Sequence, residues 1–175
     1  DTSGIYASDS TITTLINSSM NSIRGTDHGI YLDTGTINDL TNTGLIYGGD
    51  SPSTASDDTD SGITVTGAGS LISSLTNSGI ISGYDGDADN DASNDGSGII
   101  IDSGGAITTL DNSGTIIGDD YAIFVSSGTL TTLNNSGILN GDINLDSSTT
   151  NLNIIGDNAR IIGSTIGTDT TVNIN

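Results

Sequence analysis

Apolar and polar residues alternate along most of the chain with a period of two. Around the middle of the chain, Leu110 and Ile116 fall on the same side as Asn112, whereas Asp111 and Ser113 fall on the other. This period is that of a β-strand with one buried face. The positions predicted to point inward recur in four places: Leu40, Asn42, Gly44 and Ile46; Leu75, Asn77, Gly79 and Ile81; Leu110, Asn112, Gly114 and Ile116; Leu133, Asn135, Gly137 and Leu139.

A second short strand is predicted upstream of each of these segments and upstream of a degraded copy near the end of the chain. Its inward pairs are Ile30 and Leu32, Ile63 and Val65, Ile99 and Ile101, Ile123 and Val125, and Ile143 and Leu145. Gly and Ser/Thr bends separate the strands, and the good helix formers Glu and Lys are absent from the sequence. We therefore expect two or three short strands in each unit and almost no helix.

The strands belong to an internal repeat, which outranks other signals in fixing the architecture. The phrase GAITTLDNSGTIIG at 105–118 is matched at 35–48, 69–83 and 128–141, with rougher copies at each end of the chain. The Leu that anchors each copy falls at Leu15, Leu40, Leu75, Leu110, Leu133 and Leu152. A unit near 23 residues, lengthened by two Asp-rich loop insertions at 49–61 and 84–97, explains the spacing.

Strands that repeat in this way bury their inner faces by stacking, each pairing with its equivalent in the next unit at about 4.8 Å. The sequence predicts an all-β fold, a right-handed parallel β-helix (a solenoid) of about six coils, with residues 1–175 forming a single domain or a segment of a longer solenoid. An antiparallel sandwich is the alternative, because it also contains many short strands. It would not explain why equivalent residues recur at a fixed period.

Two columns of side chains follow from the stacking. The first is inward, and we expect its amides to form a ladder of stacked hydrogen bonds; its members are Asn42, Asn77, Asn112 and Asn135. The Gly two residues after each Asn is expected to permit a bend or a positive φ. The second column is outward and contains Thr64, Asn144 and a possible contact face for a partner or for lateral association, made of Tyr31, Ile100 and Phe124. Coverage by a neighbouring insertion is the alternative for these three.

Charge narrows the choice of partners. The net charge is -20, all 22 acidic residues are Asp, and the only cations are Arg24 and Arg160. Nucleic acid and anionic membranes need cationic neutralisation, so neither is expected as a partner. No apolar run is long enough to insert directly into a membrane. There is no Cys, so disulfides are excluded.

The second insertion is a candidate calcium site. Carboxylates occupy alternate positions of a short loop, as at the opening of an EF-hand or dockerin-type loop, and they belong to Asp85, Asp87, Asp89, Asp91 and Asp95. The match ends at Asn90, where Gly is usual, and at Gly96, where a closing Glu belongs. The alternative is a solvated acidic loop. The first insertion could add Asp50, Asp57, Asp58 and Asp60.

Catalytic residues are poorly represented. There is no Lys or Trp, both Arg residues are isolated, and the single imidazole, His28, stands beside Asp27 in a segment that is typical of a surface turn. We therefore expect no enzymatic activity. A polysaccharide-acting β-helix enzyme ranks third among the functions considered.

The phrase I-x-x-L-x-N-S-G-x-I-x-G, as at 107–118 and 130–141, resembles the β-helical passenger (stalk) repeats of bacterial autotransporters and related large surface adhesins. The resemblance covers most of residues 11–163 and implies secretion to the outer surface of a Gram-negative bacterium, with the chain as a processed or excised passenger. It carries over no catalytic residue. The first expectation is a secreted or cell-surface adhesive stalk that contacts a host or neighbouring cell. The alternative is a self-assembling extracellular filament or surface-layer subunit, joined head to tail or laterally with the help of calcium.

Overall fold

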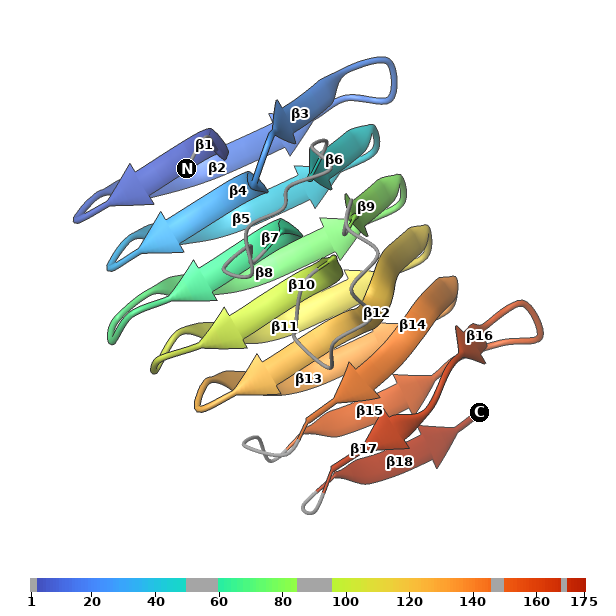
Figure 1. Cartoon of the computed structure of the whole chain (residues 1–175). Coiled ribbons are helices and arrows are strands. Elements are labelled where there is room, and N and C mark those ends of the chain that lie inside the picture. Colours follow the sequence, from blue (N-terminus) through green and yellow to red (C-terminus); the bar gives the residue numbers. More distant parts are fainter. Residues whose placement is uncertain (1–2, 50–59, 85–95, 146–149, 168–169) are drawn as a thin grey trace.

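A computed structural model describes residues 3–49, 60–84, 96–145, 150–167 and 170–175. These residues form eighteen β-strands, and the described part of the chain contains no helix. The strands follow one another in three rows, which we call the first, second and third faces (Figure 1).

The first face contains β1 (Ser3–Ser8), β4 (His28–Asp33), β7 (Ser61–Thr66), β10 (Ser97–Asp102), the later part of β12 (Thr115–Ser126), the end of β14 (Ile138–Asn144) and β17 (Thr165–Ile166). The second face contains β2 (Thr11–Asn17), β5 (Thr36–Asn42), β8 (Leu71–Asn77), β11 (Ala106–Asn112), β13 (Thr129–Asn135), β15 (Asn151–Ile154) and β18 (Thr171–Ile174). The third face contains β3 (Ser22–Gly25), β6 (Leu45–Gly48), β9 (Ile80–Gly83), the beginning of β12, the beginning of β14 and β16 (Arg160–Ile162).

All ladders between the strands are parallel, which excludes the antiparallel sandwich for the described residues. Equivalent residues pair across the whole second face: Leu15, Leu40, Leu75, Leu110, Leu133 and Leu152 form one continuous column. Side chains alternate between the two sides of each strand, and the parallel strands pair in register. Equivalent side chains of successive repeats therefore stack on the same side of the sheet. The arrangement is consistent with a parallel β-solenoid, as the repeat predicts.

The core lies between the three faces and is almost entirely aliphatic. Ile30 and Leu32 enter it from the first face, Leu75 from the second and Ile81 from the third, and all four are 0% exposed. The predicted inward pairs Ile63 and Val65, Ile99 and Ile101, Ile123 and Val125, and Ile143 and Leu145 are buried in the same cluster. Burial of these side chains is the main favourable term in folding such short strands.

The glycine of each of the four matched repeats lies in a bend at the corner between the second and third faces, so the first of its two expected roles is met and the positive φ is not. Gly114 does not have a positive φ. A Cβ at Gly114 would instead collide with the backbone oxygen of Gly79, and a Cβ at Gly137 would collide in the same way with Gly114. Close approach of successive backbones therefore requires glycine here, because no side chain fits between them.

The two insertions leave and rejoin the stack at matching points. Gly48 pairs with Gly83 at the start of the two insertions, and Ser61 pairs with Ser97 at their ends. Residues 50–59 and 85–95, which make up most of both insertions, lie outside the described residues. Where the repeat has no insertion, the chain continues directly from the third face to the first in β12, with register shifts on both sides of Tyr121.

Candidate functional site

A ladder of buried asparagines runs along the inside of the second face. Each side-chain amide donates to the Oδ1 atom of the next Asn at 2.8 Å, from Asn17 through Asn42, Asn77 and Asn112 to Asn135. The four residues predicted from the sequence therefore form the expected ladder. Asn17 was missed, although it follows Leu15 by the same two residues as in the other copies. At the other end Asn135 pairs with Ile154, which cannot continue the ladder.

Each ladder amide also holds the corner of the next layer. Asn42 Nδ2 donates to the carbonyl of Ile80 at 3.0 Å, and Asn77 Nδ2 donates to that of Thr115 at 3.2 Å. Asn135 Nδ2 donates to the carbonyl of Arg160 at 3.2 Å. The ladder thus ties the second face to the third face in the following layer, and its polar atoms are satisfied in the interior, as buried amides require.

A second ladder, on the outside of the second face, was not predicted. Asn134 Nδ2 donates to Asp111 Oδ1 at 2.6 Å, Asn153 donates to Asn134 at 2.6 Å, and Asn173 donates to Asn153 at 2.8 Å. It runs in the opposite direction to the inner ladder. The corresponding positions in the earlier repeats are Ile16, Thr41 and Thr76, so the repeat as a whole does not reveal it.

The predicted contact column on the first face is aligned, but it is not open along its length. Tyr31 pairs with Thr64, Thr64 with Ile100, and Ile100 with Phe124. Ile100 is 1% exposed, so it offers no surface to a partner, which corrects the expectation for this residue. Tyr31 and Phe124 are partly buried, and Tyr31 stacks on Tyr6 with ring centroids 5.7 Å apart.

His28 lies in a polar cluster of the first face and not in an exposed turn, contrary to the expectation. It begins β4 and is 5% exposed. Its Nδ1 atom is 3.1 Å from Ser61 Oγ and 3.3 Å from Thr64 Oγ1, and these two hydroxyl oxygens are 2.6 Å apart. Burial lowers the pKa of His28 to about 4, against the opposing effect of Asp27. The imidazole is therefore neutral at pH 7.

The same geometry argues against Ser61 of this cluster as a nucleophile. Ser61 is 0% exposed and its hydroxyl is engaged by both Thr64 and His28. A serine nucleophile has to reach a substrate, whereas this hydroxyl has no access to solvent. What the contacts do chemically is satisfy buried polar atoms beneath the surface of the first face.

The predicted calcium ligands Asp85, Asp87, Asp89, Asp91 and Asp95 all lie outside the described residues. Of the first insertion, Asp60 is described and is 5% exposed. Within the described ranges, no group of three or more His, Cys, Asp or Glu side chains is arranged to hold a metal ion. The calcium hypothesis thus depends on the sequence of the second insertion alone.

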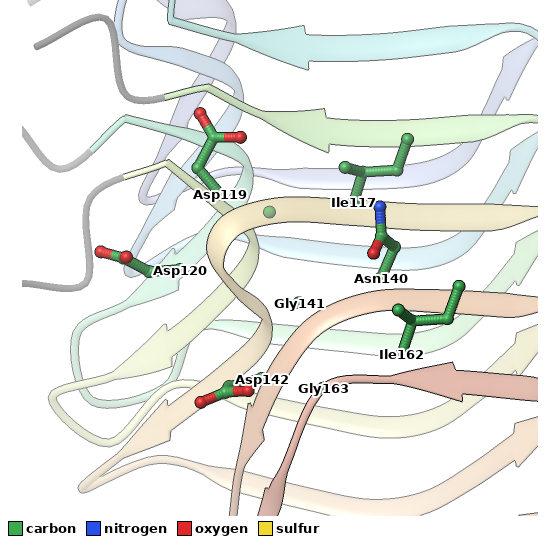
Figure 2. A pocket seen from close by; sticks show the side chains of 9 residues that line it. Ile117, Asp119, Asp120, Asn140, Gly141, Asp142, Ile162 and Gly163 are labelled. Atoms are coloured by element: carbon green, nitrogen blue, oxygen red, sulfur yellow. The ribbon is translucent and has the colours of Figure 1, made fainter. Parts of the chain in front are cut away.

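An acidic recess of about 470 Å³ lies at the corner where the third face passes into the first. Its carboxylates belong to Asp119, Asp120 and Asp142. Figure 2 shows them pointing in separate directions, and Asp142 accepts a hydrogen bond from the backbone N–H of Ser164 at 2.7 Å. The recess is an acidic surface feature, and its carboxylates do not converge on one point.

Comparison with protein-family models, with curated proteins and with solved structures finds no match for this chain. None of the described segments is a helix with the length and apolar character needed to cross a membrane.

Proposed function

We propose that the chain is a right-handed parallel β-helix of about six coils that acts, without enzymatic activity, as a structural and adhesive segment. Its site of action is the outer surface of a Gram-negative bacterium, where it contacts a host or neighbouring cell. Three consecutive strands, one from each face, make one coil, so β1 to β16 supply six coils and β17 and β18 begin another. Nucleic acid is not a partner in this proposal.

One observation carries the proposal: the same register persists from β2 to β18, with the inner ladder of asparagines running through five layers. A stack held in this way is a stiff unit in which each repeat contacts only its neighbours. Its outer side chains form ordered columns at about 4.8 Å spacing. Such a unit suits a stalk, because it keeps a binding surface at a fixed distance and orientation.

The proposal is tested by displaying the chain on an outer-membrane anchor in a Gram-negative host. Cells that display the parent chain should adhere to cultured host cells or to neighbouring bacteria more than cells that carry the anchor alone. The matched control is the double substitution Asn77→Ala and Asn112→Ala, which disturbs the stack without changing the charge. Adhesion that is absent from the parent, or equal in parent and control, would overturn the adhesive role.

The proposal includes calcium binding by the second insertion. We infer that the alternate carboxylates of Asp85, Asp87, Asp89 and Asp91, with Asp95, bind Ca²⁺, because hard oxygen donors in a short loop favour this ion. A second candidate function is self-association in an extracellular layer. It is favoured by the third face, whose strand segments carry the exposed Ile80 and Ile162 and contain no Asp.

A further inference from the structure

The third face differs in charge from the rest of the described molecule. Its strand segments are β3, β6, β9, residues 115–118 of β12, residues 138–140 of β14 and β16, and none of them contains Asp. The only two cations of the chain, Arg24 and Arg160, both belong to this face. Arg24 lies over the ring of Tyr47, 5.2 Å from its centroid.

The other two faces carry carboxylates in their strands. Asp33 and Asp102 end β4 and β10 on the first face, and Asp39 and Asp111 lie on β5 and β11 of the second. In a chain of net charge -20, a partner that approaches either face has to desolvate carboxylates or bring its own charge against them. The strand segments of the third face contain no carboxylate, although Asp119, Asp120 and Asp142 line the recess beside Ile117 and Ile162 at the corner with the first face. The cost is therefore lower on the strands and toward the corner with the second face than at the recess.

The outer side of the third face also carries exposed aliphatic side chains. Ile80 is 43% exposed and Ile162 is 52% exposed. Figure 2 shows Ile117, Asn140 and Ile162 projecting to the same side from neighbouring strands. The column beside them contains Ser22, Leu45, Ile80, Thr115, Ile138 and Arg160.

A groove of about 470 Å³ borders this face at the corner with the second face. Leu45 and Ile80 line it together with Met20, which is 96% exposed. Gly44 and Gly79 form part of its floor, since the corner admits no larger residue there. The groove is a place where a side chain of a docked partner could be buried against methyl and thioether groups.

We propose that a second copy of this chain docks side by side against the third face, with the third faces of the two copies in contact. Two like-charged molecules meet most easily where the contacting strands contain no carboxylate, and here the contact also removes aliphatic surface from water. Arg24 and Arg160 lower the negative potential over this face, so the approach is least opposed there.

The size of the face limits the surface that the contact can bury. Six strands at about 4.8 Å and four residues at about 3.3 Å give a flat area of about 380 Å². A standard stable interface buries about 800 Å² per partner, so isolated copies should pair only weakly. Side-by-side anchoring raises the effective concentration to the millimolar range, where weak pairing becomes sufficient. Only this last step rests on the proposed surface location; the pairing itself is a property of the purified chain.

The test is sedimentation equilibrium of the full chain from tens of micromolar to about 1 mM, at about 0.05 M and about 0.5 M NaCl. We expect a monomer–dimer equilibrium that strengthens with salt, because salt screens the repulsion and leaves apolar contact intact. Ile80→Asp and Ile162→Asp should each weaken the association at least about tenfold. Ile16→Asp is the matched control, because Ile16 is 64% exposed on the second face and receives the same charge.

The outcomes separate the possible occupants. A monomer at every concentration and salt level, or equal weakening by Ile16→Asp and Ile80→Asp, would overturn the proposal. Association that weakens as salt rises would also overturn it, since it would indicate Arg-led binding of an acidic surface. Unchanged far-UV circular dichroism shows that each variant is folded, and Ile80→Ser is a milder second substitution at the same position. Failure of the adhesion assay with intact dimerisation would reject the adhesive role alone.

Discussion

Asn77 is the central residue of the inner ladder and the most informative single position in it. Its Nδ2 atom donates to Asn112 Oδ1, and its Oδ1 atom accepts from Asn42 Nδ2, both at 2.8 Å. Asn77→Ala leaves Asn112 Oδ1 without this donor in a site that is 1% exposed. Because each buried polar group that loses its partner costs about 1–3 kcal/mol, we expect the free energy of unfolding to fall by about 3 kcal/mol, measured by urea titration.

The outer ladder supplies the control for this prediction. Asn134 has two Asn or Asp partners in the same way, but it is only partly buried, so water can replace the lost contacts. Asn134→Ala should cost less than about 1 kcal/mol. Equal losses in the two variants would mean that the inner ladder is no more important than a surface chain of amides.

His28 gives the folded state a dependence on pH. Its pKa is about 4 when folded, against an ordinary value of 6.5, and burial is the main cause. Between these two values the unfolded chain binds a proton that the folded chain does not, so stability falls as the pH is lowered through this window. From pH 7 to about pH 4.5 the contribution of His28 should be a loss of up to about 3 kcal/mol.

The measurement is urea unfolding at both pH values for the parent and for His28→Gln. Glutamine retains an amide that can bond to Ser61 but does not titrate, so the variant should lose less stability on acidification than the parent. The Asp residues titrate in both proteins, and the difference between the two isolates the imidazole. Parallel pH profiles would contradict a buried neutral histidine.

At the scale of the element, the corners after β5, β8, β11 and β13 depend on the absence of a side chain. Gly114→Ala should destabilise the fold by at least about 1–3 kcal/mol, because its Cβ meets the carbonyl of Gly79 and the stacked backbone has little room to move. Gly69→Ala is the comparison that tests backbone strain without a steric clash. Gly69 has a φ of 97°, and a Cβ added there would lie in open space, so only the strain of the backbone angle would destabilise the variant. We expect the loss in thermal unfolding to be larger for Gly114→Ala. The reverse order would indicate that the corner relaxes.

The elements could be predicted from the sequence where the repeat brings identical or similar residues of successive strands into register. The inner ladder and the buried Leu column follow from spacing alone, because parallel pairing in register brings equivalent positions together. The outer ladder was not predictable, since its members replace Thr and Ile only in the later repeats. Burial of Ile100 and of His28 also escaped prediction. Alternation within a strand gives the side of the sheet, but it does not tell whether another part of the chain covers that side.

At the scale of the whole molecule, the feature to explain is the excess of negative charge. A net charge of -20 with two cations makes folding work against self-repulsion. The fold collects both Arg residues on one face, the third. Composition alone gave the charge, but the separation of a carboxylate-free face required the strands to be placed.

Because the chain carries a net charge of -20, added cations should raise the melting temperature, and they can do so in two distinguishable ways. Screening by any salt acts on the total charge, so MgCl₂ and CaCl₂ at equal ionic strength should stabilise the fold equally if nothing more occurs. If Asp85, Asp87 and Asp89 bind calcium as we propose, CaCl₂ should stabilise more, because Ca²⁺ accepts irregular sets of oxygen ligands and Mg²⁺ demands an octahedron. At about 100 times the dissociation constant the additional stabilisation is about 2.7 kcal/mol.

The comparison is made by circular dichroism melting of the chelated chain, with each chloride added at matched ionic strength. Asp87→Asn with Asp89→Asn should remove the difference between calcium and magnesium, because two carboxylates of the predicted set are lost. Asp157→Asn with Asp119→Asn changes the net charge equally outside the two insertions and should leave the difference in place. Equal melting temperatures in the two chlorides would reject the calcium site and leave the second insertion as a solvated acidic loop, with screening as the only effect of the ion.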